Sequence, residues 1–125
     1  MKNAEIIKNI NALGTFTKDK VPAKLSFAIV KNLNKLKVVY QDYDQARIAL
    51  VNAYSKKDDK GNNLKDGNGF EILKEEYVSN WDEEIKELLE IEIDFEIHFI
   101  NFSILENLQL AVSDMDAIEF MIKEE

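Results

Sequence analysis

A stripe of apolar side chains at alternating steps of four and three residues runs through the middle of the chain and constrains its fold most strongly. Its members are Leu25, Ile29, Leu33, Leu36, Tyr40, Tyr43, Arg47 or Ala46, Leu50 and Tyr54. This spacing predicts a long helix over about 23–54, with a seam like that of a coiled coil and with Pro22 at its first turn. At ~1.5 Å per residue the helix reaches roughly 48 Å, whereas a compact domain of 125 residues is only ~36 Å across. We therefore expect the helix to protrude, to kink near Val38 and Val39, or to pair with another long helix.

The segment after this helix is the only stretch of low hydrophobicity, and it holds three of the four glycines. Residues 55–69 therefore predict an exposed loop with turns, long enough for a small hairpin. A second apolar stripe then predicts a helix over about 70–90, and its members are Phe70, Leu73, Tyr77, Trp81, Ile85 and Leu88. Two long helices joined by a loop predict an antiparallel helical hairpin.

The period of the apolar pattern changes to two after residue 90. The alternating residues are apolar Ile91, Ile93, Phe95, Ile97 and Phe99 and polar Glu92, Asp94, Glu96 and His98. This pattern predicts a strand over 91–99 with one buried face. A strand needs a partner for its backbone groups, and four partners remain open: residues 14–18, residues 63–65, residues 101–104, or the same strand of a second molecule.

Two short helices are predicted near the ends of the chain. The first covers 3–13, with Asn3 as its cap and Gly14 at its end, and the second covers 113–122, with Ser113 as its cap. The predicted fold class is thus α+β, in which a long antiparallel helical hairpin carries a small β element and two short helices. Because neither a repeat nor a linker divides the sequence, we expect a single domain over 1–125.

Charge is divided along the chain. Residues 1–70 hold 13 basic residues against 7 acidic ones, residues 71–96 hold 2 against 11, and residues 97–125 hold 1 against 6. One interpretation is that the two halves compensate each other through surface ion pairs worth ~0–1 kcal/mol each. Another is that the acidic surface mimics the phosphates of a nucleic acid and docks on a basic protein. A third is nucleic-acid binding by the lysines of 18–37, but with a formal net charge of −8 we do not expect direct nucleic-acid binding.

Reactive and metal-binding side chains are scarce. The absence of cysteine and the presence of one histidine exclude disulfide scaffolds, zinc fingers and thiol nucleophiles. Glu92, Asp94 and Glu96 are spaced to form a cation site together with His98, although a solvated strand face is the simpler interpretation. The sequence also lacks the glycine-rich nucleotide-binding motifs and the nucleophile elbow. We therefore predict a protein that is not an enzyme, with no catalytic residue, no metal and no cofactor.

The sequence also bears on location. No segment approaches the ~20 apolar residues of a membrane span. The first residues are charged where a signal peptide is apolar. We therefore expect a cytoplasmic protein without a membrane partner.

Four segments carry a resemblance to known proteins. They are Val21–Asn32, the turn at Lys57–Asn63, the alternating residues Ile91–Phe99, and Ser113–Ile122 with its Ile-Glu-Phe-Met-Ile ending. In these segments the chain resembles a group of small proteins of phages and prophages of low-GC Gram-positive bacteria. The resemblance implies a phage setting, in which proteins of this size serve as assembly accessories or as inhibitors of host defence, including anti-CRISPR proteins. It implies no catalytic residues.

The functional expectation combines the charge division with this resemblance. We expect a phage-encoded protein that binds and inhibits a host protein or a ribonucleoprotein complex through an acidic surface. The residues expected to bind this partner are Glu75, Glu76, Asp82, Glu83, Glu84, Glu87, Glu92, Asp94 and Glu96. The alternative is an oligomeric phage assembly protein or a tail or scaffold accessory protein. The half-buried strand without a clear partner also makes a homodimer plausible.

Overall fold

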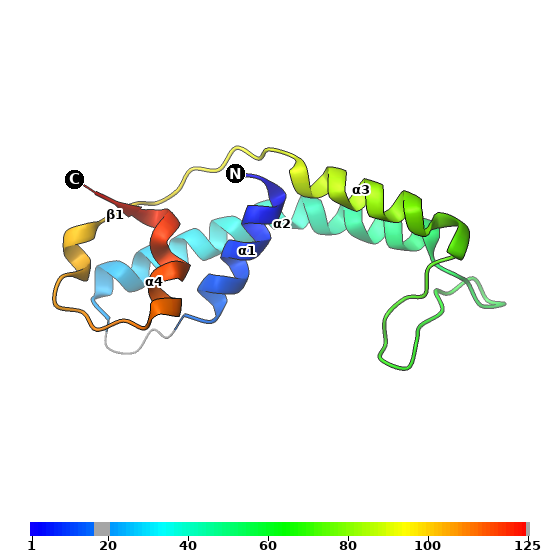
Figure 1. The fold of residues 1–125 in the computed structure, drawn as a ribbon, viewed down its shortest axis with the longest axis horizontal. Helices are drawn as coiled ribbons and strands as arrows, with labels where there is room; N and C mark the ends of the chain where they lie inside the picture. The colour runs from blue at the N-terminus through cyan, green and yellow to red at the C-terminus, as the bar shows by residue number, and fades with distance from the viewer. Residues whose placement is uncertain (17–20, 125) are drawn as a thin grey trace. The chain divides into compact units, whose positions relative to one another are not determined.

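In the computed structural model, which describes residues 1–16 and 21–124, four α-helices and a two-stranded sheet make an α+β fold (Figure 1). The elements are α1 (Asn3–Gly14), α2 (Ala23–Tyr54), α3 (Val78–Glu90), β1 (Ile100–Asn101), α4 (Val112–Ile118) and β2 (Ile122–Lys123). Short 3-10 helices cover Glu75–Tyr77, Phe102–Leu105 and Glu119–Met121.

The chain forms two compact units. The first consists of Met1–Tyr40 and Glu92–Glu125, and the second of Gln41–Ile91, so the continuous helix α2 contributes to both. The bounds predicted for α2 are confirmed. The single domain expected over 1–125 stays a prediction.

The core of the first unit is built on one face of α2. Leu25, Ile29, Asn32 and Leu36 follow one another at steps of four, three and four, and all four side chains are fully buried. The other large side chains that are fully buried in this unit are Ile6, Leu13, Ile118 and Met121. They come from α1, from α4 and from the 3-10 helix after it, and α1 and α4 lie side by side (Figure 1).

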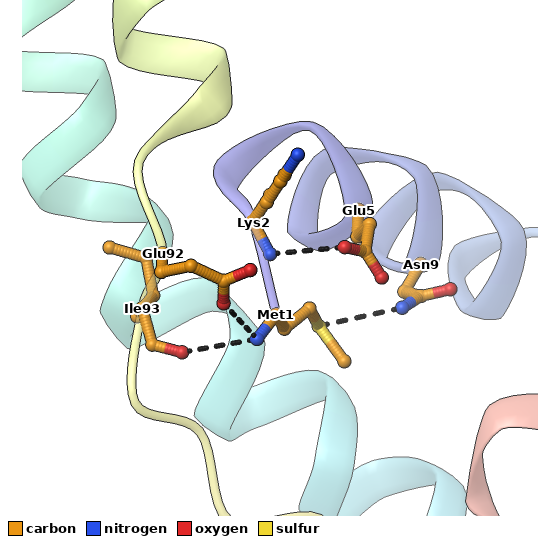
Figure 2. A network of polar contacts seen from close by, with 6 residues as sticks. All are labelled: Met1, Lys2, Glu5, Asn9, Glu92 and Ile93. Atoms are coloured by element: carbon orange, nitrogen blue, oxygen red, sulfur yellow. Dashed lines mark hydrogen bonds and ion pairs between the residues drawn. The ribbon is translucent and has the colours of Figure 1, made fainter.

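The N-terminal segment pairs with the segment that precedes β1 (Figure 2). The Met1 amino group donates to the Glu92 carboxylate at 3.0 Å and to the Ile93 carbonyl at 3.3 Å, and the Ile93 N–H donates to the Met1 carbonyl at 2.8 Å. The predicted cap of α1 is wrong by one residue. Lys2 is the N-cap and its N–H donates to the Glu5 carboxylate at 3.2 Å, while Asn3 is buried inside the helix.

The prediction of a strand over 91–99 is wrong. Within the described residues, the one bridge that this segment forms is the isolated antiparallel bridge between Lys2 and Glu92, and the parallel sheet begins at Ile100, opposite Ile122. The alternation of burial nevertheless exists, because Ile93, Phe95 and Ile97 pack half-buried against the core. The burial pattern of a strand is therefore present without its ladder of backbone hydrogen bonds. Among the open partners, residues 17 and 18 of the 14–18 segment lie outside the described residues.

The closing helix is shorter than the predicted 113–122. Ala111 is its N-cap and accepts the Met115 N–H at 3.0 Å, so Ser113 lies inside α4 and does not cap it. The α-helix ends at Ile118, and the chain passes through the 3-10 helix into β2 because Ile122 pairs with Ile100.

The second unit is a helical hairpin with a long connection. The predicted start of its second helix at 70 is wrong, because residues 70–74 form backbone pairs with the preceding loop. The Ile72 N–H donates to the Leu64 carbonyl at 3.0 Å, and the Lys56 N–H donates to the Ile72 carbonyl at 2.7 Å. The predicted exposed turns are confirmed over residues 56–69, which are exposed except for the half-buried Asn63, whereas Ser55 is fully buried. The helix α3 runs antiparallel to the C-terminal half of α2 (Figure 1).

Candidate protein-binding groove

The second unit has little buried apolar surface. Neither α3 nor the 3-10 helix before it contains a buried residue, although Trp81, Ile85 and Leu88 form the apolar stripe of α3. On α2 the buried side chains of this unit are Tyr43 and Val51. Two helices cover only one flank of each other, so part of each apolar stripe remains exposed to solvent.

This exposed part forms a groove between the two helices. Ala46, Ala49 and Leu50 of α2 line one side, and Leu88 with Ile91 lines the other, around a volume of about 500 Å³. The depression exists because two alanines, three residues apart, stand on the same helical face. Ile91 is 46% exposed. The groove is therefore an apolar surface without a covering element in its own unit.

Two carboxylates border the groove. Glu84 and Glu87 lie one turn apart on α3 and line it together with the apolar side chains. Tyr54 holds Glu84 in place, because its hydroxyl donates to Glu84 Oε2 at 2.7 Å. The Tyr54 ring in turn packs against Tyr77, with ring centroids 5.0 Å apart. This hydrogen bond to a carboxylate raises the pKa of Tyr54 above its usual value.

The helix that borders the groove carries a strong negative charge. Between residues 75 and 90 the chain has seven acidic residues and one basic residue, Lys86. Except for Glu84, which is half-buried, the acidic side chains of this stretch are exposed. Their field attracts cations and basic segments toward the groove.

The structure separates the nine predicted binding residues into two groups. Glu75, Glu76, Asp82, Glu83, Glu84 and Glu87 belong to the second unit, and Glu92, Asp94 and Glu96 belong to the first. Of the first group, Glu84 and Glu87 line the groove, while Glu75 and Glu76 lie in the 3-10 helix before α3. Sequence reasoning missed Ala49 as a lining residue, and the spacing of Ala46 and Ala49 on one helix was the available signal.

Two other kinds of site are missing from residues 1–16 and 21–124. This part of the chain holds no group of three or more histidine, cysteine, aspartate or glutamate residues arranged to bind a metal ion. Its helices include none that combines the length and the apolar character needed to cross a membrane.

The fold and the groove thus define an α+β protein with an acidic helical hairpin. No protein-family model matches the chain, and comparisons with curated proteins and with solved structures give no significant match. The phage family suggested by the sequence therefore stays a prediction.

Proposed function

We propose that this chain is a non-enzymatic protein-binding module whose α2–α3 hairpin accepts a basic amphipathic helix of a partner protein. The observation that carries the proposal is the apolar groove bordered by Glu84 and Glu87. A third helix laid in this groove would cover the apolar surface that two helices leave exposed.

The shape and the charge of the groove both select the partner. Alanines at positions 46 and 49 let a partner helix approach the α2 backbone closely, and Leu50 and Leu88 offer apolar contacts on either side. Lysine or arginine residues beside the apolar stripe of the partner would pair with Glu84 and Glu87. A second copy of α3 is a poor occupant, because its acidic side chains would approach an equally acidic helix.

This binding mode gives a physical basis for the inhibitor role expected from the resemblance to phage proteins. Host proteins that handle nucleic acids present basic helices and basic grooves. A small acidic module that occupies such a helix would keep it from its nucleic acid or from its usual partner. We therefore propose inhibition of a host protein or ribonucleoprotein complex as the biological role.

The test uses two alanine-to-tryptophan variants of the full chain. Ala49 lines the groove, whereas Ala53 is an exposed alanine one turn further along α2 that does not line it. The probe is a synthetic helix of about 18 residues, with leucines on one face flanked by lysines, and its binding is followed by fluorescence anisotropy. We expect Ala49→Trp to weaken binding by at least about tenfold (~1.4 kcal/mol) and Ala53→Trp to leave it unchanged.

Two further arms make this test decisive. A probe with glutamate in place of lysine should bind far more weakly, because it meets the carboxylates of α3. A tagged pull-down from host lysate, made with both variants, should lose its specific partner only with Ala49→Trp. Equal binding by both variants, or equal binding of both probes, would show that the groove is not the site.

One observation favours the assembly role as the second candidate. Although the acidic side chains of α3 oppose its pairing with a second α3, a helical hairpin without a buried residue on α3 also leaves the apolar surface that a four-helix bundle of two copies would cover. Sedimentation of the wild-type chain and of Ala49→Trp separates the two roles. A wild-type dimer that the tryptophan converts to a monomer would support assembly through the groove.

A further inference from the structure

The extended segment before β1, residues 92–99, is held along one backbone edge by side chains of α2. Asn32 forms two hydrogen bonds with His98: its Nδ2 donates to the His98 carbonyl at 2.9 Å, and its Oδ1 accepts the His98 N–H at 2.8 Å. The Lys35 ammonium donates to the Glu96 carbonyl at 3.2 Å. These bonds involve even-numbered residues of the segment.

The opposite edge carries the odd-numbered residues, because backbone groups of successive residues in an extended chain point to alternate edges. Ile93 uses its N–H and its carbonyl to pair with Met1 on that side. Phe95 and Ile97 follow, and within the described part of the chain their N–H and C=O groups form no hydrogen bond. Since buried backbone groups without partners are rare, we expect this stretch of the edge to face solvent.

We propose that this edge, residues 95–97, binds an extended basic segment of a partner protein by strand addition. The added strand would take up the free backbone groups of Phe95 and Ile97, and so continue the pairing that Met1 begins at Ile93. This site lies in the first unit and does not depend on the groove of the second unit.

The side chains of residues 94–97 determine which charge the added partner strand should carry. Asp94 and Glu96 are exposed and lie on the solvent face, whereas Phe95 and Ile97 pack toward the core. A strand that carries lysine or arginine at alternate positions would place these residues across from the two carboxylates. A second copy of the same segment would instead place carboxylates opposite carboxylates, which is destabilising, so a basic partner is the favoured occupant.

The experiment follows amide hydrogen exchange of the full chain by NMR, with a peptide of alternating lysine and valine as the probe. In the free protein we expect fast exchange at Phe95 and Ile97, and slow exchange at His98, whose N–H is bonded to Asn32. Saturating peptide should slow exchange at Phe95 and Ile97 by at least about tenfold. No change at these two amides with millimolar peptide would overturn the proposal.

Three controls separate strand addition from simple charge attraction and from self-association. The same peptide with methylated backbone nitrogens keeps its charge but cannot form the ladder, and equal binding of this peptide would refute the proposal. The double variant Asp94→Lys, Glu96→Lys should prefer a peptide with glutamate in place of lysine. Protection at Phe95 and Ile97 that rises with protein concentration alone would identify a second copy as the occupant and contradict the basic partner.

The variant Ala49→Trp distinguishes strand addition at residues 95–97 from helix binding in the groove. Because Ala49 belongs to the second unit, Ala49→Trp should bind the lysine–valine peptide like the wild type. Failure of strand addition and failure of the groove are therefore distinguishable.

Discussion

The Asn32 side chain forms the backbone hydrogen bonds with His98 that a neighbouring strand would otherwise form. Its removal should lower the free energy of unfolding. The side chain is fully buried on α2 and provides both a donor and an acceptor to His98, with Nδ2 also 3.4 Å from the Met121 sulfur. Asn32→Leu keeps a similar volume but leaves the N–H and C=O of His98 without partners. At about 2 kcal/mol for each of the two groups left unsatisfied, and with an offset of about 1.5 kcal/mol from the added apolar surface, the expected net loss of stability is about 2.5 kcal/mol.

Urea unfolding of both proteins measures this loss. Trp81 belongs to the second unit, so the first unit is followed through the NMR methyl signals of Ile118 and Met121, which are fully buried there. The matched control is Asn34→Leu on the exposed side of the same helix, which should change the free energy of unfolding by less than about 0.5 kcal/mol. A loss below about 0.5 kcal/mol for Asn32→Leu, with an unchanged slope against urea, would refute the reasoning.

Two further predictions concern the second unit. Glu84→Gln should lower the raised pKa of Tyr54 toward its usual value near ~10, measured by NMR titration of the ring, because the carboxylate that favours the protonated hydroxyl is lost. In the wild type, the stability that this bond contributes is present below the unfolded-state pKa and is lost as pH rises through the folded-state pKa. Gly69→Ala should destabilise the turn at residues 66–70 by about 1 kcal/mol, because Gly69 has a φ of 84° that strains an alanine. Amide exchange at Asp66, whose N–H donates to the Phe70 carbonyl, should report this loss. Gly67→Ala, at a glycine without positive φ, is the control and should have little effect.

The helical part of the fold could be predicted because helical periodicity is a local property. The apolar steps of α2 and the position of Pro22 were enough to predict its bounds, since the Pro22 carbonyl accepts the first helical N–H groups, from Leu25 and Ser26. The start of α3 could not be predicted in the same way. Phe70 and Leu73 fit the helical stripe, but backbone pairing with the loop holds this stretch extended.

The candidate groove was only partly predictable. The carboxylates of Glu84 and Glu87 are visible in the sequence as part of an acidic stretch. The hollow beside them is not visible, because it depends on which flank of α2 the helix α3 leaves uncovered. Charge is a property of single residues, whereas a groove is a property of two packed elements.

The failed strand prediction explains why an open edge exists at all. A period of two reports that alternate side chains are buried, and Ile93, Phe95 and Ile97 satisfy that pattern by packing on the helical core. It does not report what the backbone pairs with, and in this protein an asparagine side chain and the N-terminal segment perform part of that pairing. The Asn32 side chain satisfies His98, Lys35 satisfies the Glu96 carbonyl, and Met1 pairs with Ile93. The backbone groups of Phe95 and Ile97 stay available. A sequence with strand periodicity and no complementary strand therefore predicts either a partner strand from another molecule or a side chain that substitutes for one. In this chain the Asn32 side chain substitutes for a strand at His98, and the neighbouring groups of Phe95 and Ile97 remain open to a partner strand.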